Sequence, residues 1–177
     1  MKQHKKCVII ITISMGKGLK KMEVKTNVMR ILDKQKIEYK TYFYDNKDGR
    51  IDGQAIAEKI GKPCEFVFKT LVTRFERDFF VFVVPVDKEL NLKKCAKAVG
   101  KKTVEMIRVD EINKTTGYIR GGCSPIGMKK QYVTVVDESA LLCDTIIFSA
   151  GKIGAQVEMK PSDLEKVVPV TFQELTD

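Results

Sequence analysis

Two consecutive stretches rich in Phe, Val and Thr constrain the fold of this chain more than any other feature of its sequence. They cover Phe66–Arg74 and Phe79–Pro85 and flank the short polar turn Glu76-Arg77-Asp78. Strand-forming stretches joined by a short polar turn are typical of an antiparallel hairpin. Helical and strand patterns alternate irregularly on either side of it. The sequence therefore predicts a mixed α/β domain and not a doubly wound parallel sheet.

Apolar spacing, capping residues and Gly or Pro breakers predict the remaining elements. Thr26 and Asn91 are side chains that commonly cap helices, and the glycine-rich segment 117–127 is predicted to be irregular. The predicted helices and helical turns are Thr26–Gln35, Gln54–Ile60, Asn91–Val99, Asp110–Thr115, Ser139–Cys143 and Asp163–Lys166. The predicted strands outside the hairpin are Tyr39–Tyr44, Tyr132–Val136, Thr145–Ser149 and Ala155–Glu158.

Residues 1–21 differ in composition from the rest of the chain. The chain has 32 basic and 23 acidic residues, a formal net charge of +9, and six of its lysines but no acid lie in this segment. The remainder therefore carries only +3. We interpret residues 1–21 as a mis-assigned start before Met22 or a disordered extension, with a secretory signal as the alternative. A single domain is expected over residues 22–177.

Cysteine and histidine usage excludes several classes of site. The five cysteines are an odd number without a C-x-x-C pair, and the only histidine is His4. This composition argues against a disulfide framework, a Ser-His-Asp triad, a Cys-His dyad and a zinc site. The longest apolar run, Cys7–Ile11, is too short to span a bilayer as a helix. The sequence thus predicts a cytoplasmic protein without metal, cofactor or membrane partner.

Two features could carry chemistry. Lys69 lies between Val67 and Leu71 on one face of a predicted strand. It fits equally well a charge that protects a sheet edge and a cation in a cleft. The loop Gly121–Gly127 contains three glycines, a serine and a proline, so it is either a tight connection or a cradle of backbone N–H donors.

A helix rich in lysine provides the candidate nucleic-acid surface. Its five lysines within ten residues have no acid among them, and two further lysines follow the glycine-rich loop. Either this is a solvated surface helix, or it binds an anion such as RNA phosphate. The lysines with the proposed RNA contacts are Lys93, Lys97, Lys101, Lys129 and Lys130.

Four motifs follow one another along the chain after Met22. They are Lys69 within Val67–Leu71, the segment Leu92–Gly100, Thr116-Gly117-Tyr118 leading into Gly121–Gly127, and Ser149–Gly154. Together they resemble the YbaK/EbsC family, relatives of the editing domain inserted in bacterial prolyl-tRNA synthetases. The resemblance implies a mixed, partly barrel-like β-sheet with flanking helices.

It also implies an aminoacyl-tRNA deacylase, with Cys-tRNA(Pro) as the expected substrate. The chemistry would be substrate-assisted and lyase-like, because the thiol of the substrate cysteine attacks the ester carbonyl. The enzyme would supply positioning and an oxyanion cradle, which accounts for the missing catalytic histidine. The expected partners are aminoacyl-tRNA, tRNA(Pro) in particular, and a prolyl-tRNA synthetase.

The resemblance assigns roles to single residues. Lys69 would hold the 3′-terminal aminoacyl-adenosine, and the backbone of Gly121, which opens a G-x-x-x-P loop, would face the ester carbonyl. The catalytic positions implied are Lys69, Gly121 and Ser149. The substrate-binding positions implied are Tyr44, Thr70, Gly122, Ser124, Pro125 and Gly151.

Two positions depart from the family pattern. Cys123 occupies a loop position that does not carry a thiol as a family rule, so we leave it out of catalysis. Gln156 replaces an acid present in some relatives, which leaves the preferred amino acid open. A deacylase for alanine or another small residue is the enzymatic alternative, and a noncatalytic RNA-binding module is the alternative of another class. Lys69 and the G-x-x-x-P loop favour the enzyme.

Overall fold

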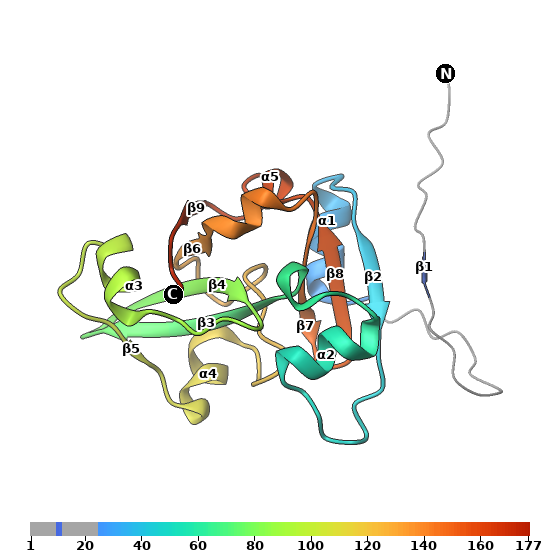
Figure 1. Cartoon of the computed structure of the whole chain (residues 1–177), viewed down its shortest axis with the longest axis horizontal. Coiled ribbons are helices and arrows are strands. Elements are labelled where there is room, and N and C mark those ends of the chain that lie inside the picture. The colour runs from blue at the N-terminus through green and yellow to red at the C-terminus, as the bar shows by residue number, and fades with distance from the viewer. Residues whose placement is uncertain (1–9, 12–24) are drawn as a thin grey trace.

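The structure is a computed structural model that describes residues 10–11 and 25–177. The N-terminal expectations, including the start at Met22 and the positions of His4 and Cys7, lie outside the described residues. Of segment 1–21 only the short strand β1 (Ile10–Ile11) is described. Figure 1 shows the remaining chain as two groups of strands with helices packed around them.

The described strands form two sheets, and neither closes into a barrel. The first has the order β1-β2-β8-β7, and the second has the order β5-β3-β4-β6-β9. Both sheets mix parallel and antiparallel pairs, which confirms the prediction of a mixed α/β fold. The bounds are β2 Lys40–Phe43, β3 Phe68–Phe75, β4 Asp78–Pro85, β5 Glu105–Met106, β6 Val133–Asp137, β7 Ile146–Lys152, β8 Ala155–Met159 and β9 Val170–Gln173.

The helices begin where capping residues predicted them. The Thr26 hydroxyl accepts a hydrogen bond from the Met29 amide at 3.3 Å, and the Asn91 side chain accepts from Lys93 and Lys94 at 3.0 and 3.1 Å. The segment predicted as a helix at Ser139–Cys143 is a 3₁₀ helix. The bounds are α1 Asn27–Lys34, α2 Gly53–Ile60, η1 Cys64–Phe66, α3 Leu92–Ala98, α4 Val109–Thr116, η2 Glu138–Leu142 and α5 Pro161–Leu164.

The predicted hairpin is confirmed and divides the core into two layers. β3 and β4 pair antiparallel from Phe68 opposite Pro85 to Phe75 opposite Asp78. Because side chains alternate along a strand, each face of the hairpin contributes to a different hydrophobic cluster. One face, with Phe80, Phe82 and Val84, packs against Cys95 and Ala96 of α3. The opposite face, with Val72, Val81 and Val83, packs against Ile112 of α4 and Ile126 of the glycine-rich segment.

A buried hydrogen-bond network holds the other sheet together. Glu158 on β8 is 6% exposed and accepts hydrogen bonds from the Tyr42 hydroxyl and, at 2.6 Å, from the Thr145 hydroxyl. Burial would raise the pKa of Glu158, but these bonds and the charge of Lys62 outweigh it and hold the pKa below its usual value. The network joins β2 to β8 and to the residue that precedes β7, and so fixes the two strands that carry Ser149 and Gln156.

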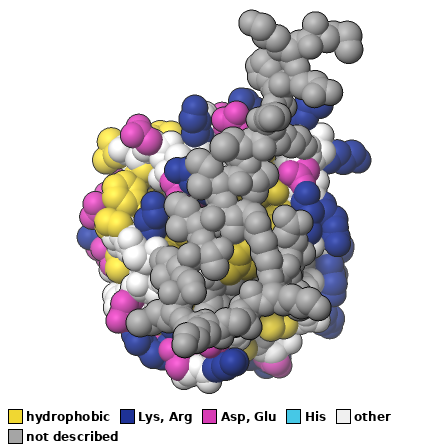
Figure 2. Space-filling view, turned by 90° about the vertical axis from the view of Figure 1, so that its right-hand side faces the viewer, with side chains coloured by type: hydrophobic (Ala, Val, Ile, Leu, Met, Phe, Trp, Pro, Cys, Tyr) yellow, Lys and Arg dark blue, Asp and Glu magenta, His cyan; other side chains and the backbone are white. Residues whose placement is uncertain are grey.

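Charged side chains are unevenly distributed over the surface. At the end of the molecule that Figure 2 faces, basic side chains gather along the right-hand edge, and the acidic ones are scattered. The net charge of the chain therefore does not locate a basic surface, which depends on where individual lysines and arginines lie.

Candidate functional site

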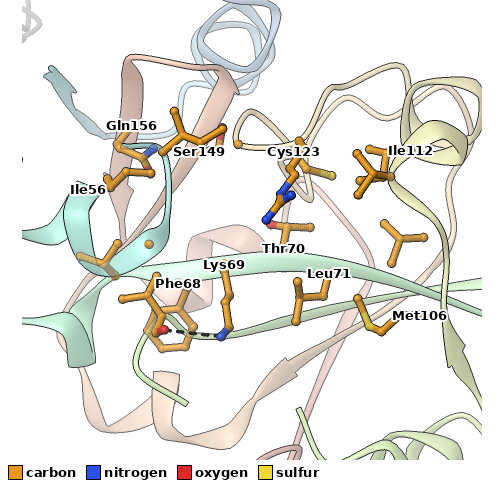
Figure 3. Close-up of a pocket in the computed structure, with 18 of the residues that line it drawn as sticks. Ile56, Phe68, Lys69, Thr70, Leu71, Met106, Ile112, Cys123, Ser149 and Gln156 are labelled. Atoms are coloured by element: carbon orange, nitrogen blue, oxygen red, sulfur yellow. Dashed lines mark hydrogen bonds between the residues drawn. The ribbon is translucent and has the colours of Figure 1, made fainter. Parts of the chain in front are cut away.

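A cavity of about 410 Å³ opens along β3. Its walls come from β3, from the segment that leads into α2, from α4, from the glycine-rich loop and from strands β7 and β8 (Figure 3). This volume lies in the range of small-molecule sites in proteins. Four of the predicted site residues line it together, although they are far apart in the sequence: Lys69, Thr70, Gly121 and Ser149.

The cavity lies where one edge of β3 is left unpaired. β4 pairs with β3 along its whole length, whereas β5 pairs only with Thr73 and Arg74. The Val67 carbonyl accepts from Val86 on the β4 side, and the Val72 carbonyl accepts from Ile107 on the other side. Backbone groups alternate in direction along an antiparallel ladder, so those of Thr70 point to the unpaired edge.

Thr70 also places a hydroxyl at this edge. Its Oγ1 is buried and has no hydrogen-bond partner among the described residues. An unsatisfied buried hydroxyl costs about 1–3 kcal/mol, so such groups are normally paired. Together with the outward-facing backbone of the same residue, it forms a set of donors and acceptors suited to a polar ligand.

Lys69 lies at the opposite side of the strand. Figure 3 shows its side chain pointing away from Ser149 and Gln156, on the same side as Leu71. Its Nζ is 3.4 Å from the Val86 carbonyl and 3.6 Å from a carboxylate oxygen of Glu89, a side chain that is 98% exposed. A pair this open to solvent contributes less than about 1 kcal/mol. The ammonium is therefore only weakly held and can exchange these contacts for a ligand.

The glycine-rich loop begins with a tight turn. The Gly122 amide donates to the Ile119 carbonyl at 2.9 Å, which closes a turn with Arg120 and Gly121 in its centre. Gly121 has a φ of +85°, as the third residue of a type II turn requires. The Gly122 amide is thus already used, whereas the Gly121 amide has no acceptor among the described residues.

Ser149 and Gln156 face each other across β7 and β8. The Ser149 Oγ accepts from the Gly151 amide at 3.1 Å, so the Ser149 hydroxyl proton is available to another acceptor. Gln156 is only 2% exposed and lines the cavity opposite Ser149. Its side-chain amide gives this wall a donor and an acceptor that a polar ligand group can contact.

The other predicted substrate-binding residues do not line the cavity, and three of them have evident structural roles. Ser124 is fully buried, and its hydroxyl oxygen accepts from the Ile126 amide at 3.3 Å. The Gly151 amide binds Ser149, and the ring of Tyr44 lies under Lys59, whose Nζ is 5.7 Å from the ring centre. The positions outside the lining are Tyr44, Gly122, Ser124, Pro125 and Gly151.

Few groups in the cavity can ionise. Among its described lining residues these are Lys69, Arg120 and Cys123. Burial raises the pKa of the Cys123 thiol to about 11, although a hydrogen bond with Thr116 opposes the shift. A thiol with this pKa is protonated near neutral pH and is a poor nucleophile. The lining thus offers neither a ready nucleophile nor a carboxylate or imidazole base.

Sequence reasoning missed several lining residues. Arg120 directly precedes Gly121 and adds a second cation, a signal that was present in the motif. The apolar walls come from separate segments that only the tertiary structure brings together. They include Ile51, Ile56, Met106, Val109 and Ile112.

The predicted RNA-binding lysines lie in two places. Those of α3 lie across the hairpin from Ile112 and Ile126, and Lys101 pairs with Asp78 at 2.8 Å. Lys93 and Lys97 are exposed and have no ion pair among the described residues. Lys129 and Lys130 lie near α4, and Lys129 donates to the Asn113 carbonyl at 3.0 Å.

Two kinds of feature are absent from the part of the chain that the structure describes. It holds no group of three or more His, Cys, Asp or Glu side chains arranged to bind a metal ion. None of its helices combines the length and the apolar character needed to cross a membrane.

Comparison with known proteins identifies similar sequences. Residues 52–167 match the family model described as aminoacyl-tRNA editing domain. A protein of Enterococcus faecalis, EbsC, named provisionally as a Cys-tRNA(Pro)/Cys-tRNA(Cys) deacylase, is 44% identical over 89% of this chain and 96% of its own length. A proline–tRNA ligase of Fervidobacterium nodosum is 30% identical over 43% of this chain, which corresponds to 13% of the ligase.

A solved structure shares the fold. It is described as that of a trans-editing enzyme, provisionally assigned, for prolyl-tRNA synthetase. It superposes with a TM-score of 0.75 at 20% identity and covers 85% of this chain and 94% of its own.

Proposed function

This chain belongs to the YbaK/EbsC family of aminoacyl-tRNA editing domains, and we propose that it hydrolyses the ester bond of mischarged aminoacyl-tRNA, with Cys-tRNA(Pro) as its main substrate. One observation carries the proposal. The cavity gathers cations and hydrogen-bonding groups but no side chain that is ready to act as nucleophile or general base. Such a site fits a reaction in which the substrate supplies the attacking group.

In the proposed reaction the thiol of the substrate cysteine attacks its own ester carbonyl. A carbon–sulfur bond forms, the bond to the ribose oxygen breaks, and the thiol proton passes to that oxygen. The released cyclic thioester is then opened by water to give free cysteine. The protein holds the thiol and the carbonyl close together in a reactive orientation, which can remove a large part of the activation barrier.

The residues of the cavity would divide this task. Lys69 at the mouth would bind an anionic part of the terminal nucleotide, and the outward-facing groups of Thr70 would bind its polar edge. The free Gly121 amide would stabilise the oxyanion that develops on the attacked carbonyl. Ser149 and Gln156 would position the aminoacyl group.

A deacylation assay with purified charged tRNAs tests the proposal. The protein should release cysteine from Cys-tRNA(Pro) and, through the same thiol, from Cys-tRNA(Cys). It should leave Ala-tRNA(Pro) intact, because alanine has no attacking group. Rapid release of alanine would show that water, and not a thiol of the substrate, attacks the ester carbonyl. RNA binding without any deacylation would support the noncatalytic module instead.

Replacing Cys123 with alanine should leave most of the deacylation activity. The wild-type thiol is held protonated by burial, so its removal takes no nucleophile from the site. We expect less than a threefold change in the single-turnover rate. A loss of about a hundredfold, as for removal of an acid, base or covalent participant, would restore an enzyme thiol to the mechanism.

Changing Lys93, Lys97 and Lys101 together to alanine should weaken tRNA binding and flatten its salt dependence. Each lost phosphate contact reduces the slope of log K against log salt by about 0.7–0.9. We expect a reduction nearer two contacts than three, because Lys101 already pairs with Asp78. Titrations at several salt concentrations measure the slope. An unchanged slope would show that this face of α3 is merely solvated.

The rate of deacylation on bound substrate should change little in the same variant. The lysines lie on the face of the hairpin opposite to α4 and the glycine-rich segment, and none of them lines the cavity. Single-turnover measurements with saturating enzyme separate this rate from binding.

A further inference from the structure

A second groove lies on the other side of α4. Its volume is about 430 Å³, and its lining includes Phe79, Arg108, Lys114, Lys129, Lys130 and Tyr132. Helix α4 separates it from the cavity along β3. Val109 and Ile112 of this helix line the cavity, whereas Glu111 and Lys114 line the groove. The two hollows are thus about one helix diameter apart, roughly 10–12 Å.

The groove carries an excess of positive charge. Its two acidic lining residues are both neutralised: Asp110 pairs with Arg108 at 3.2 Å, and Glu111 pairs with Arg74 at 3.0 Å. Three lysines remain, and none of them forms an ion pair among the described residues. The surface therefore complements a polyanion.

The groove also has an aromatic wall. The rings of Phe79 and Tyr132 lie edge to face with their centres 5.9 Å apart. The Tyr132 hydroxyl donates to the Thr115 carbonyl at 2.8 Å, which fixes this ring against α4. Lysines beside a fixed aromatic surface are the combination on which single-stranded nucleic acid binds, phosphates on the cations and bases on the rings.

Residues at the start of α4 contribute alternately to the two hollows. Met106 and Val109 line the cavity and are 43% and 57% exposed, and Arg108 between them lines the groove. A nucleotide strand that leaves the cavity at this point meets apolar side chains first and then the lysines. The two hollows therefore approach each other at the start of α4.

We propose that the groove behind α4 binds the nucleotides that directly precede the terminal one in the unpaired 3′ end of tRNA. The proposal rests on the proposed function, because the terminal aminoacyl nucleotide must occupy the cavity along β3. It assigns Lys114, Lys129 and Lys130 to the single-stranded 3′ end of the tRNA. The lysines of α3 are left to the double-stranded part of the RNA.

Binding of uncharged tRNA to the double variant Lys114→Ala/Lys130→Ala tests the proposal. Lys129 is kept, because its stem packs at Gly117 and its Nζ binds the Asn113 carbonyl. The probes are intact tRNA and the same tRNA without its unpaired 3′ nucleotides. Loss of two single-strand phosphate contacts should reduce the magnitude of the slope of log K against log salt by about 1.4 for intact tRNA. Affinity for the truncated tRNA should stay within twofold of wild type.

The variant Lys93→Ala/Lys97→Ala is the matched control, with the same change of charge on the other face of the hairpin. It should weaken both tRNAs equally. Equal weakening of both tRNAs by the α4 variant, or no weakening of either, would overturn the proposal. Because the tRNA probes carry no amino acid, this result does not depend on deacylation. Failure of the proposed enzymatic function would instead appear as intact ester on every charged tRNA.

Discussion

Replacing Lys69 with alanine is expected to reduce deacylation of Cys-tRNA(Pro) by a hundredfold or more and to leave the fold intact. A charge-assisted hydrogen bond to substrate is expected to contribute about 2–5 kcal/mol when its partner is truncated. A hundredfold loss corresponds to about 2.7 kcal/mol. Stability should change little, because among the described residues Lys69 pairs only with the exposed Glu89.

Two control variants separate substrate binding from packing and from net charge. Lys69→Met keeps the length of the side chain but not its charge, and it should be as inactive as Lys69→Ala. Lys88→Ala removes the same charge from an exposed residue nearby that does not line the cavity, and it should remain active. Deacylation rates and thermal unfolding of the three variants provide the measurement. A folded and fully active Lys69→Ala protein would remove Lys69 from the site.

The parts of the fold with strong local signals were predictable from the sequence. The hairpin of β3 and β4 has strand-forming residues on both sides of a short turn, and Thr26 and Asn91 cap helices as expected. β9 was missed, because its pairing partner β6 is far away in the sequence and Pro169 directly precedes it. β5 has two residues, too few for any periodicity.

The candidate site was predictable only where a motif contains the residue that faces the cavity. Lys69, Thr70, Gly121 and Ser149 belong to such motifs and meet at one cavity. Other residues that the glycine-rich motifs predicted do not line the cavity. Ser124 is buried and bonded locally, for example.

The groove behind α4 was beyond sequence reasoning for another reason. Phe79 is the second residue of β4, and Tyr132 directly precedes β6, so their contact depends on the parallel pairing of β4 with β6. Lys114 follows Asp110 and Glu111 within the same short helix, so the sequence alone shows no excess of positive charge there. Only the contacts of Arg74 with Glu111 and of Arg108 with Asp110 show that these acids are already paired.

Replacing Gly121 with alanine should reduce deacylation on the order of a hundredfold, as for the loss of one oxyanion donor. The residue has a φ of +85°, a conformation that costs a residue with a Cβ about 1–2 kcal/mol. The new Cβ would also lie 3.0 Å from the Ile51 Cδ1, which lines the same cavity. Because the strain of the positive φ lies in the turn itself, we expect the turn to shift and to displace the Gly121 amide.

The variant Gly100→Ala separates this effect from simple backbone strain. Gly100 has a φ of +66° beyond the end of α3, and a Cβ there would have no atom within 4 Å. Both variants should lower the melting temperature by about 2–4 °C for each kcal/mol lost. Only Gly121→Ala should lower the single-turnover rate with saturating enzyme. If the two variants lose activity in parallel, the loss follows stability, and the oxyanion role of the Gly121 amide is wrong.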